Sequence, residues 1–175
     1  MDGVKRTNHW RTLFLLLAAL LVLFVTTTVT ASGRGTAVFT VNSTADSDDG
    51  TCNYYDCTLR EAIQAANALS YGSAIIQFKV GYLNPVIIQP QSPLPAITNA
   101  VHLKTNFTNS IDVIIDGNEA GPADGLTLAG DSITVRDITI QNFDGSGLLV
   151  DGSGNLVDST TIHNNSGSGI LAASG

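Results

Sequence analysis

The chain has 175 residues, which allows at most one ordinary domain once any targeting segment is removed. Its formal net charge of −7 argues against a nucleic-acid partner, because binding phosphates requires clustered Lys and Arg. Charged residues make up only 13% of the chain, so it is not a disordered acidic tail either.

Residues 1–31 have the three-part order of a secretory signal peptide. Basic residues come first, an unbroken apolar run follows from Leu13 to Val25, and a short polar segment of small residues offers a cleavage point after Ala31. The alternative is an uncleaved membrane anchor, for which the run is short, since a spanning helix needs about 20 apolar residues. Either way, we expect a secreted or cell-surface protein.

Residues 32–72 predict a capping region with one strand and one helix. Residues 37–41 alternate apolar and polar side chains, as a half-buried strand does. In the stretch CTLREAIQAAN, at 57–67, Thr58 and Glu61 have the spacing of a capping box at a helix start. An apolar stripe of one short helix then consists of Leu59, Ala62, Ile63 and Ala66.

The two cysteines, Cys52 and Cys57, flank the turn before this helix. In an exported chain an even number of cysteines indicates a disulfide. A structural zinc site would need four ligands, which this pair does not supply. We expect a structural disulfide that holds the acidic turn against the helix and stabilises the fold by about 2 kcal/mol.

Residues 73–110 predict one or more irregular first coils. Two short runs rich in β-branched residues, AIIQF and PVIIQP, are typical of strands. The Pro-rich link QSPLPAIT, at 91–98, leads from these strands to the rest of the chain.

Residues 111–175 repeat with a 22-residue offset that aligns the segments starting at 111, 133 and 155 without a gap. Short β-branched segments separated by Gly, Asn, Asp and Ser turns at this period predict an all-β fold, a right-handed parallel β-helix. The columns expected to stack are Val113, Val135 and Val157; Gly125, Gly147 and Gly169; Leu126, Leu148 and Ile170; and Leu128, Val150 and Ala172.

Two further features follow from this fold. Asn142 and Asn164 coincide at one turn, and we expect their amides to bond along the stack. The first coil would have an open apolar end and unpaired strand edges, so the helix at 57–67 is expected to cap it.

The stretch FTVNSTADSDDGTCNYYDCTLREAIQAAN, at 39–67, resembles the CSLREA domain, with Thr58 where the namesake Ser stands. Together with SPLPAIT and VIIDG, it is similar to the start of exported bacterial right-handed β-helix proteins, some of them compared with polymorphic outer-membrane adhesins. The resemblance covers roughly residues 38–175 and brings no catalytic residues. Such proteins usually continue through many coils to a surface anchor, so the end at Gly175 is expected to be a truncation.

One polar cluster could serve an enzyme. Arg136, Asp137 and Asp158 lie close in the repeat register, with His163 on the next segment. Two carboxylates could act as acid and base in glycoside cleavage, or Asp oxygens could hold calcium for lyase chemistry. The favoured interpretation is that these residues are the outward half of an in/out alternation, so we predict no catalytic residue.

The acidic turn DSDDG, at 46–50, could also bind calcium, but it lacks the spacing of an EF-hand loop. A solvated turn is the favoured interpretation, and no cofactor or metal site is predicted.

The sequence therefore favours a non-catalytic, exported β-helix that serves adhesion or binds carbohydrate or extracellular matrix. The first alternative is a polysaccharide lyase or glycoside hydrolase on a pectin-lyase-like β-helix. The second is a stalk or passenger segment of an autotransporter-like protein. A membrane contact is expected only through the N-terminal segment or a missing C-terminal anchor.

Overall fold

The computed structural model describes residues 35–80, 84–105 and 112–173. The segment predicted as a signal peptide or anchor lies outside these residues. No helix in the described part of the chain is both long and apolar enough to cross a membrane.

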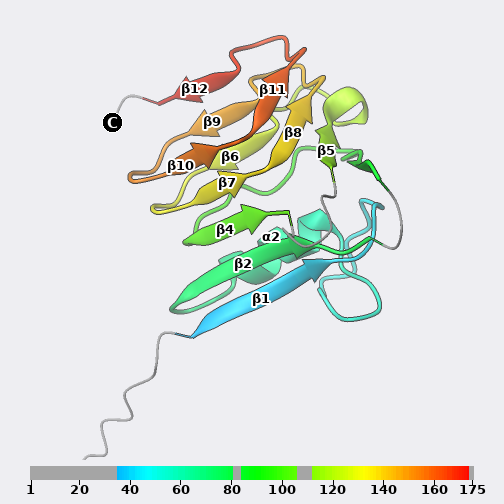
Figure 1. Ribbon diagram of the computed structural model, residues 1–175, viewed down its shortest axis with the longest axis vertical. Helices are drawn as coiled ribbons and strands as arrows, with labels where there is room; N and C mark the ends of the chain where they lie inside the picture. The colour runs from blue at the N-terminus through cyan, green and yellow to red at the C-terminus, as the bar shows by residue number, and fades with distance from the viewer. Residues whose placement is uncertain (1–34, 81–83, 106–111, 174–175) are drawn as a thin grey trace, which may run out of the picture. The chain divides into compact units, whose positions relative to one another are not determined.

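A parallel sheet of five strands, sheet A, forms one face of the molecule (Figure 1), in the order β1-β2-β4-β7-β10. Strands β1 and β2 confirm two strands that the sequence predicts. Strands β2 and β4 both lie within the region expected to form irregular coils, and no strand was predicted at β4. The strands are β1 (Thr36–Val41), β2 (Ser73–Phe78), β4 (Val101–Lys104), β7 (Thr134–Arg136) and β10 (Leu156–Asp158).

Sheet B has four parallel strands in the order β11-β8-β5-β3. These strands are β3 (Val86–Ile88), β5 (Val113–Asp116), β8 (Ile138–Gln141) and β11 (Thr161–His163).

Sheet C has three parallel strands in the order β12-β9-β6, and a single bridge adds Ile97 beside Leu128 of β6. Its strands are β6 (Leu126–Leu128), β9 (Leu148–Val150) and β12 (Ile170–Ala172).

The chain visits sheets A, B and C in the same order in each coil, which defines a parallel β-solenoid. Strand β2 is followed by β3 and Ile97, then β4 by β5 and β6, β7 by β8 and β9, and β10 by β11 and β12. The coils have roughly 26 residues on average. The predicted β-solenoid architecture is confirmed.

The 22-residue period holds in the later coils. Leu126 pairs with Leu148, and Leu148 pairs with Ile170. In the same register Val135 pairs with Val157. From β6 onward, then, the period predicted from the sequence is confirmed.

The gapless alignment is wrong for the segment before β6. Val113 pairs with Ile138, which is 25 residues later (138 − 113), and it therefore lies in sheet B rather than in the column of Val135. The neighbour of Val135 in the preceding coil is Leu103. The difference arises because the earlier coil contains an additional 3-10 turn, η1 (Gly117–Glu119), between β5 and β6.

Corners between the sheets use residues in the left-handed backbone region. Asp137 (φ 57°) and Ser159 (φ 52°) turn the chain from sheet A to sheet B in successive coils, and Asn142 (φ 61°) and Asn164 (φ 56°) follow β8 and β11. Asn and Asp tolerate this conformation better than most residues.

The Asn142 side-chain amide donates to Asp116 Oδ2 (3.1 Å) rather than bonding to Asn164, so the predicted amide ladder is wrong. The left-handed backbone conformation at both positions explains why Asn recurs there.

The glycine column has a steric cause. A Cβ atom at Gly125 would collide with the carbonyl oxygen of Gly147, and one at Gly147 would come within 2.9 Å of the Gly169 carbonyl oxygen. Glycine is required where successive coils approach so closely.

The interior stacks carry the core, but they become exposed toward the last described coil. Leu126 is 1% exposed and Leu148 is fully buried, whereas Ile170 is 50% exposed. The predicted interior column is therefore confirmed for its first two members. Strands β10, β11 and β12 are each the terminal strand of their sheet, so no described segment covers Ile170, the third member of the column.

The predicted helix is confirmed as α2 (Leu59–Asn67). Thr58 Oγ1 accepts from the Glu61 backbone N–H (3.2 Å), and Glu61 Oε2 accepts from the Thr58 N–H (2.8 Å), which completes the capping box. All four residues of the apolar stripe are at most 1% exposed: Leu59, Ala62, Ile63 and Ala66.

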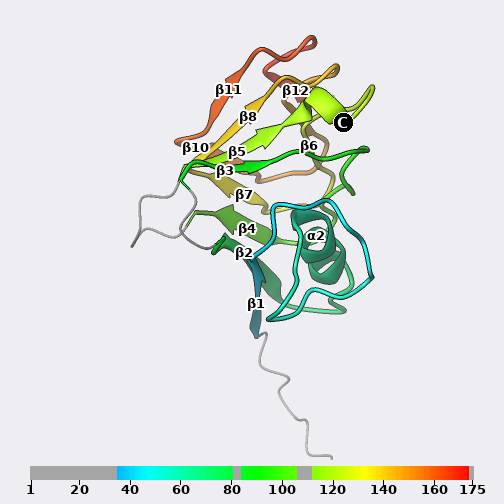
Figure 2. The same cartoon turned by 90° about the vertical axis from the view of Figure 1, so that its right-hand side faces the viewer.

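Asn67 joins the end of α2 to the Pro-rich link. Its Nδ2 donates to the Ala96 carbonyl oxygen (2.7 Å) and its Oδ1 accepts from the Thr98 N–H (2.9 Å). These bonds flank Ile97 in the way that a neighbouring strand would, while Ile97 pairs with Leu128 on its other side. The helix therefore closes the edge that sheet C would otherwise leave open. Figure 2 shows α2 beside β1 and β2, at the end of the solenoid where the described chain begins.

Arg60 makes a second connection between α2 and the same link. Its guanidinium forms an ion pair with Asp46 (2.8 Å), and it donates to the carbonyl oxygens of Ser92 (3.0 Å) and Pro93 (2.9 Å). The side chains of Arg60 and Asp46 are only 10% and 4% exposed. The expectation of a solvated acidic turn is therefore wrong for Asp46, because this carboxylate neutralises a buried cation.

Replacing Asp46 with Ala should lower the free energy of unfolding by about 3–5 kcal/mol, because it leaves a buried guanidinium without its counter-ion. Asp48→Ala is the matched control, since Asp48 is an exposed carboxylate of the same turn that accepts from Gln64 (2.9 Å). Asp48→Ala should lower the free energy of unfolding, measured by urea denaturation, by less than about 1 kcal/mol. Equal losses in both variants would contradict the role given to the Arg60–Asp46 pair.

Candidate functional site

The structure brings together three of the four polar residues that the sequence singles out. Arg136 on β7 lies directly beside Asp158 on β10, and its Nη2 forms an ion pair with the Asp158 carboxylate. Asp137 Oδ2 lies 3.8 Å from Arg136 Nε. His163 is elsewhere, since it pairs with Gln141 in sheet B.

This arrangement supports a structural role for the cluster. The Arg136 guanidinium forms an ion pair with Asp158 and also lies near one oxygen of Asp137, so it partly neutralises both carboxylates. A glycosidase instead needs two carboxyl groups separated by the width of the scissile bond, or of that bond and a water molecule.

A shallow cleft of about 420 Å³ lies beside this corner on sheet B. Two carboxylates from successive coils, Asp112 and Asp137, line it, together with the hydroxyls of Thr139 and Thr161. An enzyme interpretation predicts a cleft with acidic residues on adjacent coils. The structure offers such a pair, but it consists of Asp137 and Asp112, whereas the sequence pointed to Asp158 and did not single out Asp112.

A second cleft, the disulfide cleft, lies at the N-terminal end of the solenoid. It has a volume of about 520 Å³ and lies where the carboxyl ends of β1 and β2 meet the loop between the cysteines. The residues that line it are Val38, Phe39, Thr40, Asn42, Cys52, Asn53, Tyr54, Gln77 and Lys79.

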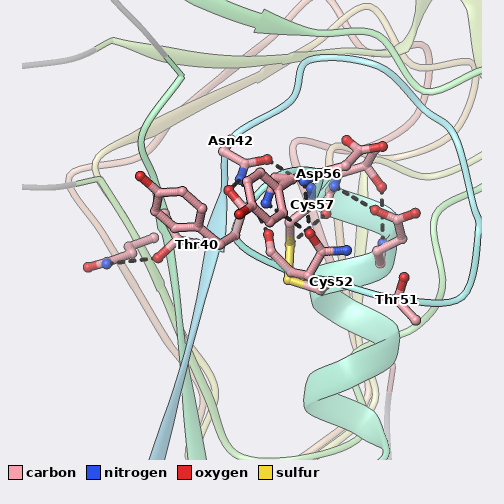
Figure 3. Close-up of a disulfide and its surroundings, with 12 residues drawn as sticks. Thr40, Asn42, Thr51, Cys52, Asp56 and Cys57 are labelled. Atoms are coloured by element: carbon pink, nitrogen blue, oxygen red, sulfur yellow. Dashed lines mark hydrogen bonds between the residues drawn. A yellow bond between two sulfur atoms is a disulfide. The ribbon is translucent and has the colours of Figure 1, made fainter.

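The loop that forms one wall of the disulfide cleft is held from both ends. Cys52 and Cys57 form the predicted disulfide, with their Cα atoms 4.3 Å apart. The Asn42 side chain donates to the Tyr54 carbonyl oxygen (2.7 Å) and accepts from the Cys57 N–H (2.8 Å). Figure 3 shows this network around the disulfide. The loop conformation is therefore established before any ligand arrives.

Two tyrosines extend from this loop into solvent. Tyr54 is 87% exposed and Tyr55 is 91% exposed, and their rings meet edge to face with centroids 5.4 Å apart. On the floor of the cleft, Gln77 Nε2 donates to Thr40 Oγ1 (3.1 Å). The cleft thus combines an exposed aromatic ring with amide, hydroxyl and amine groups.

The analysis of the sequence did not single out Tyr54 or the cleft. The available signal was the pair of adjacent tyrosines inside a short disulfide loop, where a large aromatic side chain has no core to enter. The contributions of Gln77 and Lys79 required the strand register, because they lie more than twenty residues away along the chain.

The pKa of two carboxyl groups lies below the ordinary value of 3.8. In Asp49 the hydrogen bonds from the Thr51 hydroxyl and backbone N–H lower the pKa. For Asp116, burial raises the pKa, but hydrogen bonds from Gln141, Asn118 and Asn142 outweigh it. Both groups are suited to accept hydrogen bonds as anions, not to donate a proton.

In the acidic turn, Asp46, Asp48 and Asp49 accept from Arg60, Gln64 and Thr51 respectively. No group of three or more His, Cys, Asp or Glu residues within the described ranges has the geometry to hold a metal ion.

Residues 124–175 match the family model described as "Right handed beta helix region". This match and the three parallel sheets define the class of this part of the chain, a parallel β-solenoid of the right-handed β-helix type. No curated protein and no solved structure matches the chain.

Replacing Asp116 with Asn should lower stability at neutral pH by about 1 kcal/mol, because charge-assisted hydrogen bonds are lost. Because its pKa is lowered in the folded state, Asp116 contributes this stability fully above its ordinary pKa of 3.8 and loses it as the pH falls further. The difference between wild type and D116N should therefore stay constant from about pH 7 to pH 5 and shrink as the pH falls below about 4 toward pH 3 in urea denaturation. A difference that stays constant over the whole range would contradict the role assigned to Asp116, and Asp144→Asn, at an exposed turn, controls for loss of net charge.

Proposed function

We propose that the chain is an exported β-solenoid that binds carbohydrate or extracellular matrix at the cell surface or in the secreted state, without catalysis. The observation that carries this proposal is the disulfide cleft with its exposed tyrosine. An aromatic ring beside hydrogen-bonding side chains suits a sugar, which presents an apolar ring face and hydroxyl groups at its edge.

The rigidity of the loop supports the same function. A loop that is already ordered loses less conformational entropy on binding than a flexible one. Tyrosine adds a large contact area with only two side-chain torsions to restrict. The disulfide and Asn42 thus make the two exposed tyrosines effective as contact residues.

Export is supported by the disulfide, because such bonds persist in oxidising compartments. The resemblance of residues 39–67 to the CSLREA domain of exported bacterial β-helix proteins, some compared with outer-membrane adhesins, agrees with this location. In this proposal the N-terminal segment directs export. A purely passive stalk would have no need of exposed aromatic residues beside a cleft.

The second candidate is a glycoside hydrolase or polysaccharide lyase that uses the sheet B cleft. The observation in its favour is that Asp112 and Asp137 line one cleft from successive coils. Against it, Asp137 also lies beside the Arg136 guanidinium. We therefore prefer the binding function.

The test is binding of the purified exported chain to immobilised glycans and matrix proteins. Tyr54→Ala should weaken binding about five- to tenfold, because an aromatic contact contributes roughly 0.5–1.5 kcal/mol beyond the area that it buries. Tyr71→Ala is the matched control, since Tyr71 is also exposed (68%) but does not line the cleft, and it should leave binding unchanged.

Three outcomes would contradict the proposal: no binding to any glycan or matrix protein, equal losses in both tyrosine variants, or turnover. Turnover would appear as new reducing ends or unsaturated products released from a bound polysaccharide. If that release disappeared in Asp137→Asn while Tyr54→Ala retained it, the enzyme candidate would replace the binding function.

A further inference from the structure

Positive charge in the described part of the chain is confined to few positions. Its Lys and Arg residues are Arg60, Lys79, Lys104 and Arg136. The first is buried and paired with Asp46. The other three lie on one side of sheet A or at its end, on a chain whose formal net charge is −7.

The strand alternation places these three residues on the same outward face. In β4, Val101 and Leu103 are buried, so the intervening and following positions, which include Lys104, face outward. In β7 only Val135 is buried, which places Arg136 on the outward face as well. Just after β2, Lys79 is exposed between the buried residues Phe78 and Val80.

Lys79 differs from the other two because it lines the disulfide cleft. Among the described residues that line this cleft, Lys79 is the one charged residue, and no described Asp or Glu accompanies it. Its backbone N–H donates to the Val41 carbonyl oxygen (2.8 Å), but its ammonium group forms no hydrogen bond or ion pair with any residue that the structure describes. Its ammonium group is therefore available to an anion that enters the cleft.

A second group is available next to it. Gln77 uses its amide N–H to donate to Thr40, which leaves the Gln77 carbonyl oxygen to accept from a ligand hydroxyl. A ligand that contacts all three groups must therefore offer a ring face to Tyr54, a hydroxyl to Gln77 and an anionic group to Lys79. These requirements together describe a sugar acid.

We infer that the disulfide cleft selects a sugar residue that carries a carboxylate, with Lys79 as the specificity-determining residue. This inference rests on the proposed carbohydrate-binding function and adds the class of sugar. A Lys–carboxylate hydrogen bond is charge-assisted, so it discriminates against the neutral sugar. The local positive charge also favours the approach of an anion to an otherwise acidic protein.

The test compares two oligosaccharides of equal length and linkage, one built of glucuronic acid and one of glucose, by titration calorimetry on the full exported chain. The wild type should bind the acidic oligosaccharide about five- to tenfold more tightly than the neutral one. Raising the salt concentration should reduce this preference, because an exposed ion pair is screened.

Three variants identify the source of the preference. Lys79→Gln should abolish the preference by lowering the affinity for the acidic oligosaccharide to that for the neutral one, and Lys79→Arg should retain the preference. Lys104→Gln also removes one positive charge from the outward face of sheet A, but outside the cleft, so this variant should retain the preference for the acidic oligosaccharide. The inference would be overturned if Lys79→Gln kept the preference, or if Lys104→Gln lost it equally.

The result separates this inference from the proposed function. If both oligosaccharides bind equally and Tyr54→Ala still weakens binding, the chain binds carbohydrate but the selection of a sugar acid is wrong. If neither oligosaccharide nor any glycan binds, both are wrong.

Discussion

The structure depends on closing the open edge of its first coil. A parallel solenoid pairs each strand with the coil above and below, so its first coil presents unpaired backbone groups and an apolar end. Helix α2 supplies the missing neighbour. Asn67 flanks Ile97 with two hydrogen bonds, Arg60 holds the preceding part of the link, and the apolar stripe of the helix fills the interior.

This closure also explains the candidate site. The short chain segment that connects β1 to α2 must cross the end of the solenoid, and it carries the disulfide and the acidic turn. Asp46 neutralises Arg60 beneath this segment, while Asn42 and the disulfide hold its outer part against β1. The same contacts that cap the solenoid therefore position Tyr54 beside Gln77, so stability and ligand binding share one set of interactions.

Much of the fold could be predicted because local signals agree with it. The capping box, the apolar stripe of α2 and the 22-residue period after Leu126 are all readable from spacing alone. The register of Val113 could not be predicted, because the 3-10 turn at Gly117–Glu119 lengthens its coil and no distinctive motif marks it. The burial of Asp46 and the grouping of Tyr54 with Lys79 depend on contacts between distant segments, which spacing cannot reveal.

The most direct test of this account is the hydrogen exchange of backbone amides, measured by NMR, in Asn67→Ala. If α2 acts as the neighbour of the link, the Thr98 amide should exchange at least about tenfold faster than in the wild type, because it loses its acceptor. The amides of β9 (Leu148–Val150) should keep their protection, since they lie in a later coil. Unchanged protection of Thr98, or equal loss of protection in β9, would contradict the claim that α2 closes the first coil.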